Sequence, residues 1–588
     1  ESGLGRPNDS RTRAESPALW HRVGFHRPLA GLLTLFPIGL ALFLPLAVFN
    51  LRTVPEILLP NEQTLTNWQQ VGEWMSIVAL CFDAGVGVAV VYHFSIHRIH
   101  YPERSMRFFQ FYLWWQLLSG VVLAGLVVLG MVTVLHRTSI AHLIYHILVW
   151  TTLQVPGFFG VFGFFFRAIQ RFDREQLLRL LEMVGVVACQ VISVSLFSAW
   201  GETQPAVGRA LGGAMGLGIG IYVARALTFA LGVALYRQAG YPLSAMLRPN
   251  YGGDVVNRTL SFGLRRTAGT LALTLSSLFT VRWLAGQLSE QNVTYTHWTA
   301  LFTALWVYDL LLWGLGQSLV PAMAQISALD YRTLLRYYVS QAMRYGVGLS
   351  LFLMSVLSAI GPAIWLELLE LPASAGTWLL PILGLGAARW LVWVPHRALE
   401  AGGRPGLSSL VMLVAHALRV IGTVTMTPRW GLKTVFIVNA AGLAVEIILA
   451  WILMHRLIVR IKLNVWQTWI APLGSAFLLY QSVSLVTGEV EGASLWMNVA
   501  GYTVMMIVAL PIFAALTALL GGWDRGSLRD LERAVRLCHV SYPLSWLTLQ
   551  LTRFAANLSP LHGRFPVSIY ALAEEEAEAL THARTSSD

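Results

Sequence analysis

The chain of 588 residues is poor in charge. Asp, Glu, Lys and Arg make up 12% of it, about half the share in an ordinary soluble domain, whereas hydrophobic residues make up 56%. This composition excludes an ordinary globular enzyme, a disordered chain and a small secreted scaffold. Apolar stretches of about 20 residues recur along the sequence, and each is long enough to cross a bilayer core of about 30 Å as a helix. We therefore predict an all-α, polytopic membrane protein.

Cysteines are also few, and the short motifs of common enzymes are absent. Cys81, Cys189 and Cys538 lie far apart and form no CxxC pair, so neither a disulfide framework nor a zinc site is indicated. The sequence contains no GxxxxGKS/T phosphate-binding loop, no HExxH and no GxSxG. We therefore expect no enzyme activity, no cofactor and no bound metal.

Fourteen apolar segments are predicted to span the membrane. Two of them are longer than a bilayer requires, and the glycines at 212–220 would allow one of these two to bend. The segments lie near residues 30–50, 71–93, 113–135, 141–163, 178–199, 208–236, 258–283, 297–325, 337–363, 377–398, 405–426, 432–455, 466–487 and 495–521.

The distribution of basic residues orients these spans. With the N-terminus placed in the cytoplasm, 32 of the 41 Lys and Arg residues fall in cytoplasmic segments or in the inner turn of a span, as Arg265 and Arg266 do, 5 fall in outer loops and 4 deeper within spans. Cytoplasmic loops of membrane proteins collect Lys and Arg in this way. The same bias accounts for the net charge of +11 without a nucleic-acid partner. We therefore predict that both chain ends are cytoplasmic.

Charged residues inside the spans are the candidates for function, because each costs at least about 2.5–3.5 kcal/mol to insert. Five lie near mid-depth and should face protein, either in an interhelical ion pair or in a cavity. These are Asp83, Arg225, Asp309, Arg389 and Glu446. Four others lie near span ends, where the alternative is that the long side chain reaches the headgroups. These are Arg265, Arg266, Arg282 and Arg419. His396, near the end of the tenth span, is expected to have a structural hydrogen-bonding role.

The segment after the last span carries an amphipathic pattern. Residues 523–537 place Leu528, Leu531 and Val535 on one helical stripe with charges around the rest. Such a helix could lie on the inner membrane surface or pack under the bundle. The tail 573–588 is charged, and we expect its end to be disordered.

Five segments resemble the helices of bacterial polysaccharide flippases. They are CFDAGVGVAVVYHFS (81–95), SFGLRRTAGTLALTLSSLFTVRWLAG (261–286), QSLVPAMAQIS (317–327), LLPILGLGAARWLVWVPHRALEAGGRP (379–405) and TPRWGLKTVFIVNAAGLAVEIILAWIL (427–453). Their order and their placement on the expected helices match that group over residues 70–521. The chain therefore resembles the multidrug/oligosaccharidyl-lipid/polysaccharide exporter (MOP) superfamily, in its O-antigen or exopolysaccharide flippase branch.

This resemblance implies two pseudo-symmetric six-helix lobes, residues 30–236 and 258–456, with two extra helices at 466–521. A cytoplasmic tail (1–29) precedes them, and an amphipathic helix and charged tail (522–588) follow. In such a fold spans 1, 2, 7 and 8 line a central cavity, together with parts of spans 4, 5, 10 and 11. The resemblance thus places five residues at the substrate or ion site: Asp83, Arg265, Arg266, Asp309 and Arg389.

The function implied is a flippase that moves a lipid-linked oligosaccharide or polysaccharide precursor across the bacterial inner membrane by alternating access. Its substrate would be an anionic, lipid-linked glycan whose pyrophosphate suits the embedded arginines. A proton or sodium ion could be coupled through Asp83 or Asp309. The alternatives are an ion-coupled multidrug antiporter of the same fold, a lipid II flippase, and a non-transporting membrane scaffold or complex subunit.

Overall fold

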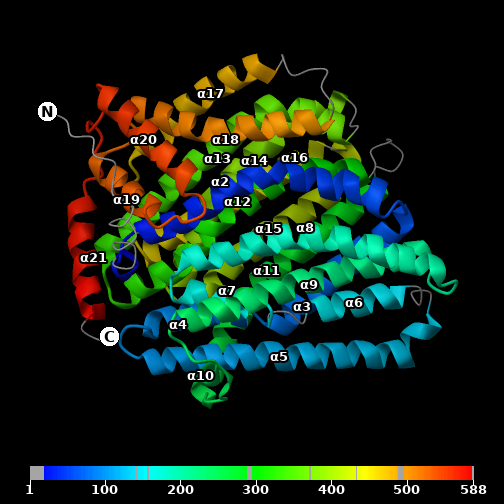
Figure 1. Cartoon of the computed structure of the whole chain (residues 1–588). Helices are drawn as coiled ribbons and strands as arrows, with labels where there is room; N and C mark the ends of the chain where they lie inside the picture. Colours follow the sequence, from blue (N-terminus) through cyan, green and yellow to red (C-terminus); the bar gives the residue numbers. More distant parts are fainter. Residues whose placement is uncertain are drawn as a thin grey trace.

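The computed structural model describes residues 19–585 except 139–142, 155–157, 288–294, 370–372, 432 and 488–494. All regular elements in this part of the chain are helices (Figure 1). Ten of them are long and apolar enough to cross a membrane, and the bent pair α3 and α4 makes an eleventh. The remaining three predicted spans correspond to α6 with α7, to α11 and to α12. The prediction of an all-α, polytopic protein is confirmed.

We call the helices from α2 to α9 the first group. Its members are α2 (His26–Val48) with the π-helical segment η1 (Phe49–Leu58), α3 (Glu62–Asp83), α4 (Val86–His97), α5 (Pro102–Thr133) with η2 (Leu135–Arg137), α6 (Ile144–Gln154), α7 (Val161–Ala168), α8 (Phe172–Thr203) and α9 (Gly208–Gln238). The short helix α10 (Leu243–Leu247) leads out of the group and packs on α5.

The second group comprises α11 to α16, and two further long helices follow it. These helices are α11 (Gly253–Gln287), α12 (Tyr295–Ala328), α13 (Arg332–Leu369), α14 (Ala373–Ala401), α15 (Pro405–Trp430), α16 (Lys433–Leu457), η6 (Trp466–Ile470) with α17 (Ala471–Thr487), and α18 (Leu495–Leu519). The two groups meet where α2 and α4 pack against α12, and where α3, α4 and α5 pack against α11. α17 and α18 pack on α13, and α18 also packs on α2.

Glycines allow α8 and α9 to pack closely along their length. A Cβ atom on Gly212 would lie 2.3 Å from the carbonyl oxygen of Phe197, and one on Gly216 would lie 2.5 Å from the Cα of Val194. α9 runs without a break through this stretch. The glycines at 212–220 therefore serve close packing against α8, and they do not interrupt the helix.

The second predicted span is broken in its middle. Between α3 and α4, Ala84 and Gly85 have left-handed φ angles of 51° and 67°, and the two helices bend by 40°. The break lies directly on α11, because a Cβ on Gly263 would be 2.4 Å from the carbonyl oxygen of Ala84. A side chain at Gly263 would force the two backbones apart, so glycine is what permits this contact between the groups.

Three helices after α18 form a C-terminal cap, which we define as residues 520–585. They are α19 (Arg525–Val535), α20 (Tyr542–Leu558) and α21 (Tyr570–Thr585), and α19 and α21 lie at the left end of the view in Figure 1. In α19, Leu531 and Val535 are buried against the bundle, so this helix is packed under it. The charged tail is also ordered as α21 up to Thr585, whereas we expected disorder at its end; residues 586–588 lie outside the described part.

The cap joins the two groups of helices at this end. The Ser541 hydroxyl donates a hydrogen bond to the Leu33 carbonyl of α2, at 2.6 Å. The Tyr337 hydroxyl of α13 donates to the Asp530 carboxyl, also at 2.6 Å. The first and second groups cannot separate here without breaking contacts to the cap.

Docking of the cap is expected to weaken as the pH rises from about 4 to above 6. Burial raises the pKa of the Asp530 carboxyl to about 6 from its ordinary 3.8, although Tyr337 and Arg533 stabilise the charged form; the charges of Glu574 and Asp524 raise the pKa further. A raised pKa means that the folded state favours the protonated carboxyl. Its contribution is therefore complete below about pH 4 and is lost as the pH passes through about 6, a change of about 3 kcal/mol.

The measurement is the rate at which trypsin releases the cap from purified protein between pH 4 and pH 7, corrected for the pH dependence of trypsin on a peptide substrate. Asp530→Asn should flatten the dependence, because asparagine does not titrate. An equal pH slope in the variant and the parent would contradict the assignment to Asp530.

Candidate functional site

A buried ion network lies in the N-terminal half of α11, beside the helix break. Glu400, near the end of α14, is 1% exposed. Its Oε1 lies 2.8 Å from Nε of Arg266 on α11, and its Oε2 accepts a hydrogen bond of 2.6 Å from Nη1 of Arg397. One buried carboxylate therefore holds two arginines from two helices.

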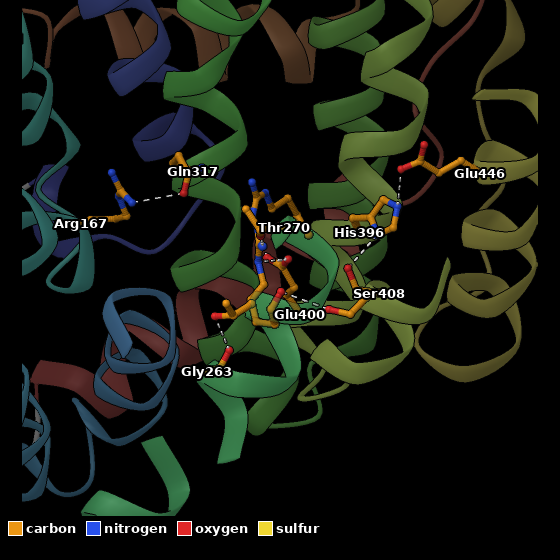
Figure 2. A network of polar contacts seen from close by, with 12 residues as sticks. Arg167, Gly263, Thr270, Gln317, His396, Glu400, Ser408 and Glu446 are labelled. Atoms are coloured by element: carbon orange, nitrogen blue, oxygen red, sulfur yellow. Dashed lines mark hydrogen bonds and ion pairs between the residues drawn. The ribbon is translucent and has the colours of Figure 1, made fainter. Parts of the chain in front are cut away.

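Arg167 brings the first group of helices into contact with this region. Its guanidinium lies 2.5 Å from Glu175 of α8 and donates a 3.2 Å hydrogen bond to the Gln317 side chain of α12. The charge of Arg167 also acts on Arg397, so the two clusters are electrostatically linked. Figure 2 shows the Arg167–Gln317 contact on one side of Glu400 and the His396–Glu446 contact on the other.

A second polar cluster lies entirely within the second group. His396 Nδ1 is 2.7 Å from the Ser408 hydroxyl, and His396 Nε2 is 3.4 Å from Glu446 of α16. The other oxygen of Glu446 accepts a 2.8 Å hydrogen bond from Arg419 of α15. These contacts join α14, α15 and α16. They match the structural role expected for His396. Arg419, whose side chain could also have reached the lipid headgroups, is paired with the buried Glu446 instead.

Two of the five predicted site residues come together at the junction between the groups. Asp83 is the last residue of α3, at the helix break, and its carboxylate accepts a 2.5 Å hydrogen bond from Gln116 of α5. Arg266 acts on Asp83 through its charge. Asp83 of the first group and Arg266 of the second group thus lie close enough for their charges to interact.

The other three predicted site residues do not join this pair. Arg265 is exposed, and among the described residues it makes no ion pair. Arg389 is half-buried on α14, where its charge acts on His416 and Arg419 of α15. Asp309 lies in α12, but its side chain is outside the described part of the chain.

Two further embedded arginines make contacts within the first group or between groups. Arg225 of α9 forms a 3.2 Å ion pair with Glu182 of α8, and both side chains are partly exposed. Arg282 of α11 lies over the Trp74 ring of α3, 4.9 Å from its centre. Both residues thus have protein partners.

Sequence reasoning missed the residue at the centre of the network. Glu400 belongs to the segment ALEAGGRP, which reads as a helix end followed by a turn, and so it was not counted among the embedded charges. A signal was nevertheless present, because Glu400 follows Arg397 by three positions and such residues are neighbours on a helix. The sequence gave no indication that Arg266 would be the second partner.

Four arginines (Arg167, Arg179, Arg266 and Arg397) surround three carboxylates (Glu175, Glu400 and Asp83) at this junction. Glu182 also acts on Arg179, so cations and carboxylates are equal in number in this largely buried place. Guanidinium groups bind carboxylate and phosphate through paired hydrogen bonds. The arginines of the junction could therefore bind an anionic group only in competition with the carboxylates that they now hold. No set of His, Cys, Asp and Glu placed to hold a metal ion occurs within the described ranges.

No family model matches the sequence, and no curated protein matches it either. The structure, however, is similar to solved MOP-superfamily transporters. An outward-facing multidrug resistance MATE family transporter of the MOP superfamily gives a TM-score of 0.57 at 12% identity, with 74% of this chain and 96% of the other covered. A MATE in complex with MaL6 gives 0.55 at 12% identity, with 80% and 99% covered.

A third similar structure is a MOP superfamily transporter from Pyrococcus furiosus, whose binding pocket has a reverse polarity described as suggesting a different function. It gives a TM-score of 0.55 at 14% identity, with 74% of this chain and 96% of that chain covered. The chain therefore has the fold of the MOP superfamily. The fold that the sequence resemblance implied is thus confirmed, and the flippase branch is taken up below as a proposal.

Proposed function

We propose that the protein is a membrane flippase for a lipid-linked oligosaccharide or polysaccharide precursor. In this proposal the first and second groups of helices act as the two lobes of an alternating-access transporter in the bacterial inner membrane. The pyrophosphate of the substrate is bound by arginines at the junction between the groups. The chain carries out no chemical step.

The observation that supports this proposal most is the set of arginines around Glu400. Arg266 and Arg397 share one carboxylate, so a pyrophosphate that reached the junction would meet two guanidinium groups already held close together, one in an ion pair with Glu400 and the other hydrogen-bonded to it. Arg167 and Gln317 would complete the site from the other side. A cationic drug would meet repulsion from the same arginines.

The second candidate is an ion-coupled multidrug antiporter. It is favoured by Asp83, which lies at the break of the second span and within the first group. In this reading a proton or sodium ion binds at Asp83, and the substrate is a cation that the carboxylate attracts.

Arg266→Gln is expected to lower the flipping rate of a fluorescent polyprenyl-pyrophosphate oligosaccharide in proteoliposomes by about ten-fold or more. One charge-assisted hydrogen bond contributes about 1.5–3 kcal/mol, which corresponds to at least that factor. Glu400 keeps its bond to Arg397 in this variant, so the protein should remain folded.

The matched control is Arg265→Gln, which removes the same charge from the neighbouring, exposed position and should flip at the parental rate. Equal rates in both variants and the parent would exclude Arg266 from substrate binding. Loss of cationic-dye transport in Asp83→Asn, with no glycan flipping by the parent protein, would establish the multidrug alternative instead.

A further inference from the structure

A cavity of about 580 Å³ lies on the second group of helices, apart from the network around Glu400. Its walls come from three connections: the turn between α12 and α13, the turn between α14 and α15, and the segment that follows α16. A volume of this size is typical of sites for small molecules, which occupy about 300–1,000 Å³. The chain thus forms a hollow where three separate loops converge.

The charges that line this hollow are almost all positive. Five arginines contribute to its wall, with Asp330 as the single carboxylate: Arg332, Arg336, Arg404, Arg456 and Arg460. Asp330 forms a 2.8 Å ion pair with Arg332, both of them exposed. Within the described part of the chain, the other four guanidinium groups have no hydrogen bond or ion pair. Like charges gathered in one concave surface raise the local concentration of anions.

The surroundings of the hollow point to a ligand that also touches the membrane. Leu457, Ile458 and Val459 are part of its lining. On the adjoining helix α16, Ile448 and Ile452 are exposed, and they lie four residues apart on one face. An apolar stripe that leads to a cluster of cations matches the two ends of an anionic lipid.

We propose that this arginine-lined cavity binds an anion that carries two or more phosphate groups. The guanidinium groups of Arg336, Arg404, Arg456 and Arg460 would hold the phosphates through charge-assisted hydrogen bonds. The phosphates belong either to a lipid headgroup, with the acyl chains along α16, or to a soluble polyphosphate. This site is distinct from the junction around Glu400 and does not depend on the transport function proposed above.

The test compares two double variants of the full chain. Arg336→Gln with Arg456→Gln removes two cations from the cavity. Arg107→Gln with Arg525→Gln removes two exposed arginines that lie outside it, and these have no partner among the described residues. Binding is followed by native mass spectrometry and thermal unfolding with two probes: cardiolipin in mixed micelles, and inorganic pyrophosphate.

The cavity variant should bind the preferred probe at least about ten-fold more weakly than the parent, while the control variant binds as the parent does. Tighter binding of cardiolipin would identify the ligand as a lipid headgroup, and tighter binding of pyrophosphate would identify a soluble phosphate. Two results would overturn the proposal: binding of neither probe by the parent, or an equal loss in both double variants. An equal loss in both double variants would mean that the basic surface as a whole attracts the anion, and not the cavity.

Discussion

Replacing Glu400 with glutamine is expected to lower the free energy of unfolding by about 3–5 kcal/mol, because it leaves two buried cations without their counterion. The side chain of Glu400 is 2% exposed and those of Arg266 and Arg397 are 15% and 9% exposed, so water cannot replace the lost carboxylate. Thermal and chemical unfolding of the detergent-solubilised protein would measure the loss.

The control for Glu400 is Glu182→Gln, which removes one partner of the partly exposed Arg225–Glu182 pair. Side chains there are 30% and 40% exposed, and the expected loss is below about 1 kcal/mol. Adding Arg397→Leu to Glu400→Gln should recover part of the stability, since one buried cation is then removed. Similar losses for Glu400→Gln and Glu182→Gln would show that the central pair is solvated.

Trp523→Ala is expected to release the C-terminal cap, at a cost of about 3–5 kcal/mol for the loss of a large buried aromatic side chain. Trp523 is 8% exposed and lines an apolar cavity of about 90 Å³ between the cap, α2, α13 and α18, which its removal would enlarge. The Arg344 guanidinium of α13 lies 4.8 Å from the centre of its ring, and the same arginine donates a 2.6 Å hydrogen bond to the Gly522 carbonyl. The substitution therefore removes the packing that fixes the start of the cap.

Limited trypsin digestion measures this effect, because release of the cap allows helix α19, which carries Arg525 and Arg529, to open into the extended backbone that trypsin cleaves. Trp546→Ala is the matched control: this tryptophan belongs to α20 of the same cap and is 42% exposed, so its loss should cost less than about 1 kcal/mol. Digestion of Trp523→Ala at the parental rate would mean that the cap is held by its other contacts alone.

The helices that cross the membrane could be predicted from the sequence because a bilayer demands long apolar runs and leaves arginine in the loops on one side. The prediction of a span from its hydropathy is weakest for α11. This helix carries Arg265 and Arg266, and it is not among the helices that are apolar enough to cross a membrane by composition alone. The break in the second span was not predictable in the same way. A left-handed alanine at position 84 depends on its contact with Gly263, and nothing in the segment DAGVG specifies that partner.

The candidate site could be predicted only in part. Hydropathy identifies a cation such as Arg266 because it stands out within an apolar run, and it also identifies Asp83. It does not identify Glu400, whose position at a helix end is an ordinary place for a carboxylate. Pairing between Arg266 and Glu400 joins residues 134 positions apart, and only the packing of α11 on α15, the helix that directly follows α14, brings them together. The amphipathic pattern of residues 523–537 likewise fits two positions, a helix on the inner membrane surface or a helix packed under the bundle. Only the structure distinguishes them.

The contacts of the C-terminal cap also constrain the order in which the protein is made. The backbone N–H of Val23 donates a 2.9 Å hydrogen bond to Thr581, 558 positions later in the chain. Segments emerge from the ribosome in sequence order, and closing so long a loop is entropically costly until the intervening helices have packed. The start of the chain must therefore wait beside the first span while all later spans are inserted. Cap docking is then the final step of assembly, and a chain that stalls before its last helices is left with an open, apolar end that quality-control proteases can recognise.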